Sequence, residues 1–112
     1  MCDSRRRITT ETALGLLADA RRRRILHRIA ETADGTTLDR LANDLERTGD
    51  ANRKPDAVRI ELHHVHLPKL RDANVIEYDA ARGTVRRGRH FRDVLSLLRA
   101  IENHQDTSVA SS

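Results

Sequence analysis

Three histidines lie close together in the segment RIELHHVHLPKLRDANVIEYD, residues 59–79, and imidazole is a common metal ligand. If the segment is helical, His63 and His66 share roughly one face, whereas His64 points about 100° away from His63. The three rings therefore cannot hold one metal ion unaided, and no Asp or Cys at a suitable ligand spacing accompanies them. We expect no metal or other cofactor, with metal-responsive regulation through His63 and His66 as an alternative.

The same residues also have a structural interpretation. On a helical projection His63 and His66 fall inside the apolar arc that contains Leu62, so we expect both to be core or interface side chains hydrogen-bonded to the backbone. Pro68 removes one helical hydrogen bond and frees the carbonyl of His64, which predicts a kink.

Catalytic patterns are absent from the sequence. It contains no Ser-His-Asp or Cys-His order and no glycine-rich phosphate loop, and the scattered carboxylates fit helix faces. We therefore expect a protein that is not an enzyme and has no small-molecule substrate.

Charge is distributed in blocks along the chain, which has a net charge of +4. Residues 1–30 and 53–92 are basic, whereas residues 31–52 and 93–112 are acidic. A cationic face of this kind indicates a nucleic-acid partner, and an ordinary solvated surface is the alternative. Tyr78 and Phe91 are the only large aromatic side chains, which disfavours RNA or single-stranded DNA because proteins that bind these stack bases on aromatic rings.

The elements that position these residues follow from apolar spacing and helix caps. Helices are predicted from Thr9 or Thr10 to about Ala20 and over about 20–32, 36–47, 55–73 and 89–103; strands are predicted at 75–79 and 84–87. We expect one domain over residues 9–104, with a disordered basic N-terminus over 1–8 and a disordered tail over 105–112. The predicted fold is mainly α with a small antiparallel β-hairpin, a winged helix-turn-helix with extra N- and C-terminal helices.

This layout selects the candidate DNA-binding residues. They lie at the start of the long helix and in the hairpin, where cations can meet phosphates: Arg53, Lys54, Arg59, Arg82, Arg86, Arg87 and Arg89. Arg21 to Arg24 span about 300° of a helix, so we expect one or two of these four to reach a phosphate and the others to be solvated.

The terminal helices carry an apolar seam that suggests a homodimer. Its candidate interface residues are Leu14, Leu17, Phe91, Leu95, Leu98 and Ile101. Packing of the last helix on the chain's own first helix is the alternative.

The compartment follows from cysteine usage and hydropathy. Cys2 has no partner for a disulfide, and no apolar run is long enough to cross a membrane. We expect a soluble cytoplasmic protein with no membrane partner.

Two segments resemble known families. ALGLLADARRRRILHRIAE resembles the opening of ArsR-like and related archaeal winged-helix regulators, and IELHHVHLPKLRDANVIEYD resembles small winged-helix proteins of halophilic archaea. Asn74 stands where the latter family usually has Gly, and Asn also accepts the left-handed end of a helix. Over residues 13–87 the resemblance implies a DNA-binding-like domain used in transcription regulation. In the salt-rich cytosol that it also implies, a basic surface favours an anionic partner.

The leading hypothesis is therefore a homodimeric regulator of transcription that binds double-stranded DNA. The alternative is a winged-helix protein–protein interaction module without DNA binding.

Overall fold

The structure is a computed structural model that describes residues 8–32, 34–48 and 55–111. In chain order the elements are α2 (Thr10–Leu17), α3 (Ala20–Ala30), β1 (Thr36–Thr37), α4 (Leu38–Thr48), α5 (Pro55–Glu61), η1 (Leu62–His66), α6 (Leu67–Asp72), β2 (Ile76–Asp79), β3 (Thr84–Arg87) and α7 (Phe91–Ser111). Residues 1–7, which hold most of the expected disordered N-terminus, lie outside the described residues, as do Arg53 and Lys54.

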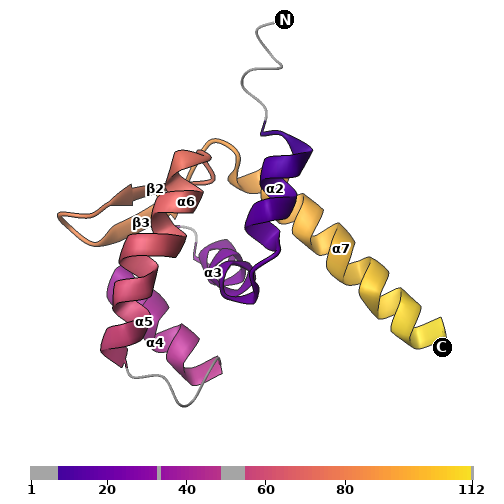
Figure 1. Cartoon of the computed structure of the whole chain (residues 1–112), viewed down its shortest axis with the longest axis horizontal. Coiled ribbons are helices and arrows are strands. Elements are labelled where there is room, and N and C mark those ends of the chain that lie inside the picture. The colour runs from indigo at the N-terminus through magenta and orange to yellow at the C-terminus, as the bar shows by residue number, and fades with distance from the viewer. Residues whose placement is uncertain (1–7, 33, 49–54, 112) are drawn as a thin grey trace, which may run out of the picture.

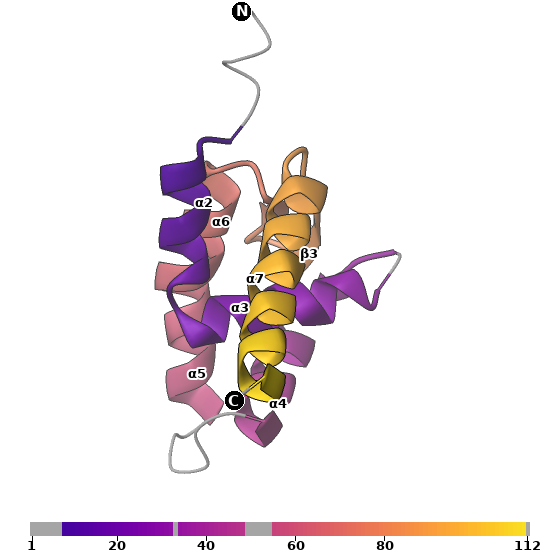
Figure 2. The ribbon, with the colours of Figure 1, turned by 90° about the vertical axis from the view of Figure 1, so that its right-hand side faces the viewer.

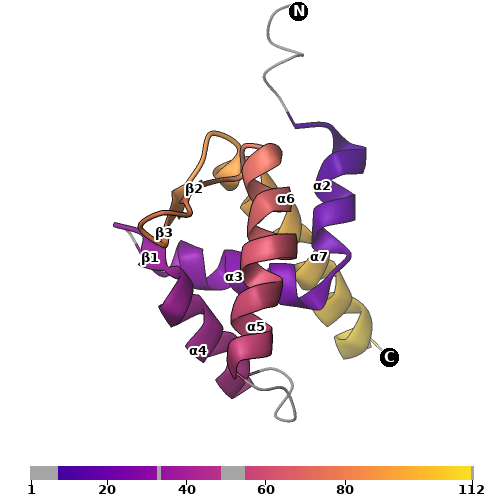
Figure 3. The same cartoon turned by 60° about the vertical axis from the view of Figure 1, so that its left-hand side comes forward.

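The strands form one antiparallel sheet in the order β1-β3-β2 (Figure 3). In the wing, the hairpin β2–β3, Tyr78 pairs with Val85 and Glu77 pairs with Arg86, so each pair shares one face of the sheet. Ile76, Tyr78 and Val85 are buried on the inner face. The mainly helical fold with a small antiparallel sheet confirms the predicted winged helix-turn-helix class. The strand β1 was not predicted, because two residues are too few to show an alternating pattern.

The continuous rod α5–η1–α6, called the recognition helix below after the role expected from the sequence, lies on one side of the body with α4 at one end and the wing at the other (Figures 1 and 3). α3 crosses behind it. Apolar side chains from α3, α4, α6 and the wing meet in the core, where Ile25, Leu41, Leu70 and Val85 are fully buried.

The final helix α7 packs against α2 and α3 (Figure 2), and its C-terminal end extends away from the body (Figure 1). It begins at Phe91 and continues to Ser111, beyond the expected end at Asn103. Its buried residues Phe91, Val94 and Leu98 place this helix in the same core as the winged helix.

Several helices begin or end at residues of types that favour helix caps. The hydroxyl of Thr9 accepts the N–H of Thr12 at the start of α2, and the carboxylate of Asp19 accepts the N–H of Arg21 at the start of α3. Asn74 has φ of 62°, the left-handed conformation that ends a helix, which confirms the prediction that α6 ends there.

The expected irregularity at Pro68 takes the form of a π-helical turn, η1, in which the N–H of Leu67 donates to the carbonyl of Leu62. Pro68 has no N–H, and in a regular α-helix its ring would clash with the carbonyl of His64. The wider turn immediately before the proline relieves that conflict.

Candidate nucleic-acid interface

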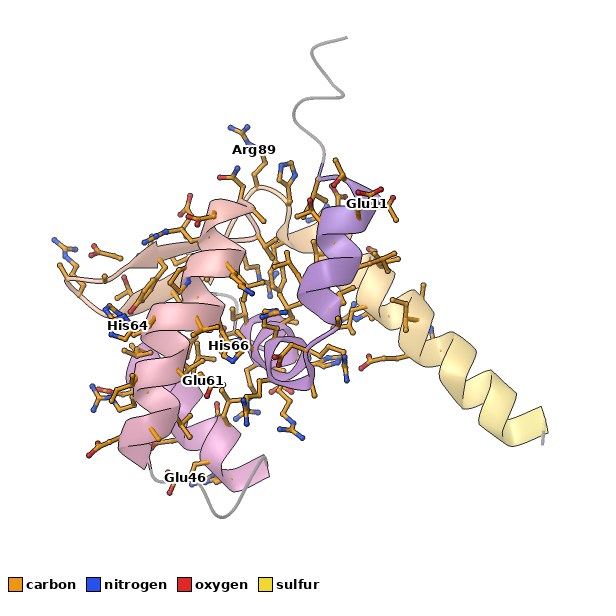
Figure 4. All side chains as sticks on the ribbon, in the orientation of Figure 1. Glu11, Glu46, Glu61, His64, His66 and Arg89 are labelled. Atoms are coloured by element: carbon orange, nitrogen blue, oxygen red, sulfur yellow. The ribbon has the colours of Figure 1, made fainter. Side chains whose placement is uncertain are left out.

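The recognition helix presents one buried and one exposed side. Val58, Leu62, His66 and Leu70 are buried, and Asp56, Ile60 and His64 are exposed. In Figure 4 the side chains of Glu61 and His66 lie on the side of this helix that faces α3, and His64 lies on the opposite side. The exposed side is the surface that a partner can reach.

The tip of the wing meets the start of α4. The N–H of Leu38 donates to the carbonyl of Gly83 over 2.8 Å, and Arg59 of α5 forms an ion pair with Asp39 over 2.9 Å. Arg82 lies in the hairpin turn, is highly exposed and stands 3.9 Å from Asp79. Two predicted DNA-binding cations, Arg59 and Arg82, therefore flank the same end of α4.

The two arginines of β3 have different environments because adjacent strand residues face opposite sides of the sheet. Arg86 is exposed on the outer face opposite Glu77. Arg87 donates to the carbonyl of Ala30 over 2.8 Å and stacks on Phe91, with its guanidinium carbon 5.3 Å from the ring centre. Arg87, although exposed, therefore joins the end of α3 to the start of α7, a contact that its position in the sequence does not indicate.

Arg89 is exposed at the base of the wing, near the upper end of α6 in Figure 4. Arg82 and Arg89 thus lie at opposite ends of the hairpin. Arg53 and Lys54 lie outside the described residues, so the structure does not place these two relative to the others.

His63 joins the recognition helix to the wing. Its Nδ1 lies 2.7 Å from the hydroxyl of Tyr78 on β2, and its ring meets that of His64 edge to face with 4.6 Å between centroids. Burial raises the pKa of Tyr78 above its ordinary value of 10.0, so the phenol stays protonated at neutral pH. The partner of His63 is a side chain, and the predicted bond to the backbone is wrong.

His66 is buried in a polar network with two other side chains. Its Nε2 lies 2.9 Å from Glu61 Oε1, and its Nδ1 lies 3.4 Å from a terminal nitrogen of Arg22. Because arginine can only donate, Nδ1 accepts and Nε2–H donates to the carboxylate. Its partners are also side chains, which again corrects the predicted backbone bond.

Arg22 is 7% exposed and also donates to the carbonyls of Leu16 and Gly15 over 2.8 and 3.1 Å. Its neighbour Arg21 pairs with Glu61, and Arg23 donates to the carbonyl of Leu17. The expectation that the members of this arginine run are solvated or bound to phosphate is therefore wrong for Arg22, whereas Arg21 and Arg23 are partly exposed and also bond within the chain. The sequence carries no signal for a buried arginine, since its partners are mostly backbone carbonyls at the end of another helix.

Asp19 lies beside this network. Burial would raise its pKa, but the N–H of Arg21 and the charges of Arg22 and, when protonated, His66 hold it below its ordinary value of 3.8. The carboxylate at the start of α3 is therefore stabilised in its ionised form.

The predicted dimer seam contributes mainly to the chain's own core. Leu17, Phe91, Leu95 and Leu98 are buried, and Ile101 is partly buried. Leu14 is 46% exposed and is the member of the set most available to a second copy.

No three His, Cys, Asp or Glu side chains among the described residues are grouped to hold a metal ion. Within the same residues, no helix combines the length and apolar character that crossing a bilayer requires.

Comparison with known proteins identifies a family. Neither the curated proteins nor the solved structures include a match to the chain. The family model described as a domain of unknown function, DUF7344, matches residues 14–86, from α2 to the end of the wing. Because that match covers more than half of the 112 residues, the chain belongs to the DUF7344 family.

Proposed function

We propose that this protein binds duplex DNA through the recognition helix and the wing, and that it regulates transcription. In a winged helix-turn-helix the recognition helix enters the major groove and a neighbouring element contacts the backbone. The observation that carries the proposal is the meeting of Arg59, the start of α4 and Arg82 beside the exposed side of the recognition helix.

Phosphate would compete with carboxylates for these cations. Arg59 pairs with Asp39 and Arg82 lies near Asp79, and both arginines are exposed. Exposed ion pairs contribute about 0–1 kcal/mol, so a phosphate can replace the carboxylate at little cost. Arg86, Arg53 and Lys54 extend the proposed phosphate contacts, and the exposed Arg87 could join them if it gave up its bond to the carbonyl of Ala30.

The test is selection of bound duplexes from a random pool at two salt concentrations. If five phosphates are contacted, a fourfold rise in salt weakens binding by about 500-fold, because each contact releases counterions. Enrichment of a sequence together with this steep response supports the proposal. A flat salt response, or no retained duplex at low salt, contradicts it.

A second candidate, a protein-interaction module, is favoured by exposed apolar side chains. Leu14, Ile60 and Val65 are 46%, 60% and 40% exposed. Binding to a protein partner that persists in high salt, without duplex binding, would distinguish this candidate.

Homodimerisation is a separate proposal. Since most of the predicted seam is buried within the chain, a second copy would contact Leu14 and the extending part of α7. Two recognition helices would then meet half-sites about one DNA turn apart. Sedimentation equilibrium tests this, and a monomer at all concentrations contradicts it.

A further inference from the structure

Buried and exposed side chains each recur every four residues along the recognition helix. Val58, Leu62, His66 and Leu70 are buried at this spacing. In an ideal α-helix a spacing of four drifts by about 40° per step, which would turn Leu70 about 120° away from Val58. Three α-helical turns span about 10.8 residues, and replacing one of them by a π-turn adds about one residue. The step from Val58 to Leu70 therefore makes about three full turns, so η1 keeps the buried residues on one side.

The same repeat defines the opposite side. Asp56, Ile60 and His64 are offset by two residues from the buried set, which is half of a four-residue turn, and all three are exposed. His63 and Arg59 lie between the two sides, towards Tyr78 and Asp39. The stripe of Asp56, Ile60 and His64 thus points away from the core and is bordered by the contacts to the wing and α4.

Internal packing does not account for two members of this stripe. Ile60 is 60% exposed, although a large apolar side chain in water is unfavourable. His64 makes no hydrogen bond to any described residue, and its ring rests edge to face on His63. The His63 ring is in turn held by Tyr78 of the wing, so His64 is supported from the hairpin. Asp56 has an ordinary explanation, because an acidic residue in the first turn stabilises a helix.

We propose that Ile60 and His64 read base edges in the major groove, Ile60 against the methyl group of a thymine and His64 by donating an N–H to the N7 of a purine. An apolar side chain recognises thymine by its C5 methyl group, and purine N7 is an acceptor open to the groove. This inference rests on the proposed DNA binding and adds the residues that give it sequence preference. Arg59 and Arg82 supply affinity for phosphate without base information.

The test uses the duplexes enriched by the wild-type protein from a random pool. Each thymine is replaced in turn by deoxyuridine, which lacks the methyl group, and each purine by its 7-deaza analogue, which lacks N7. For the wild type, one deoxyuridine position weakens binding about fourfold, the value of one buried methyl group, and one 7-deaza position weakens it about fivefold.

Variants assign these effects to the two side chains. Ile60→Ala abolishes the response to deoxyuridine and keeps the response to the 7-deaza purine, and His64→Ala does the reverse. Val65→Ala is the matched control, since Val65 is also apolar, 40% exposed and on the same helix, but lies outside the stripe. All three variants keep the thermal unfolding temperature of the wild type, because the replaced side chains are exposed.

The inference is overturned if duplexes are bound without sequence preference, or if Ile60→Ala and His64→Ala keep both responses. These results leave DNA binding itself intact. Failure of the wild type to retain any duplex at low salt overturns the proposed function together with this inference.

Discussion

A terminal nitrogen of Arg22 lies 3.4 Å from Nδ1 of His66, and both side chains are buried. The pair connects the corner between α2 and α3 to the middle of the recognition helix, 44 residues later in the chain. Glu61 completes the link, because it accepts from His66 and from Arg21. The angle at which the recognition helix leaves the body is therefore fixed by polar bonds as well as by apolar packing.

Replacing Arg22 should destabilise the fold strongly. Arg22→Ala leaves the carbonyls of Leu16 and Gly15 and the Nδ1 of His66 without their donor, which should lower the free energy of unfolding by about 3 kcal/mol. Arg22→Lys should recover less than half of this loss, since one ammonium group cannot reproduce the arginine fork. Urea unfolding measures both values. Arg24→Ala, in the same run of arginines, should change the free energy of unfolding by less than about 0.5 kcal/mol. A loss as large as that of Arg22→Ala would contradict the specific role of Arg22.

Asp19 should make stability depend on pH in the acidic range. Its pKa is lower in the folded state than its ordinary value of 3.8, so the folded state binds its proton less readily than the unfolded chain. Its contribution is complete above about pH 5 and is lost as the pH falls through the folded-state pKa. Asp19→Asn keeps a capping side chain without the charge, so its unfolding free energy should fall less between about pH 5 and pH 3. An equal fall in the unfolding free energy of the two proteins over this pH range would refute this role.

The bond between His63 and Tyr78 should couple the recognition helix to the wing. A double-mutant cycle with His63→Ala and Tyr78→Phe should give a coupling free energy of about 1 kcal/mol, measured by urea unfolding. Each single variant should also speed amide hydrogen exchange in β2. Additive effects of the two substitutions would show that the bond does not hold the wing in place.

Leu98 should stabilise the chain itself. It is fully buried in the core between α7 and its neighbours, so Leu98→Ala should lower the free energy of unfolding by about 3 kcal/mol at every protein concentration. Leu14→Ala, at an exposed position, should cost less than about 0.5 kcal/mol. A loss for Leu98→Ala that disappears as the protein is concentrated would instead place Leu98 in a dimer interface.

Much of the fold could be predicted because local signals agree with it. Threonine and proline mark the helix starts, Asn74 marks the end of α6, and alternation in IEYD and TVRR marks the wing. The strand β1 could not be predicted, since its two residues are recognised by pairing with β3 rather than by their own pattern.

The candidate site was harder to predict, because a charge in the sequence does not reveal its partner in the fold. Arg86 and Arg87 are adjacent, chemically identical and both exposed, yet Arg86 lies opposite Glu77 on the outer face and Arg87 bonds to Ala30 and stacks on Phe91. The outward direction of His64 follows from helical geometry alone. Ile60 shares that face because it lies four residues earlier in the helix. The four-residue repeat of the buried side depends on the π-turn, which Pro68 indicates only as an irregularity.

The salt dependence of duplex binding by matched arginine variants tests the central claim most directly. Arg82→Gln and Arg99→Gln remove the same charge, the first at the tip of the wing and the second on α7, and both side chains are exposed. If the tip of the wing contacts phosphate, Arg82→Gln lowers the slope of log K against log salt by about 1, and Arg99→Gln leaves the slope of the wild type unchanged. Equal slopes for all three proteins, or a wild-type affinity that does not respond to salt, would contradict the account.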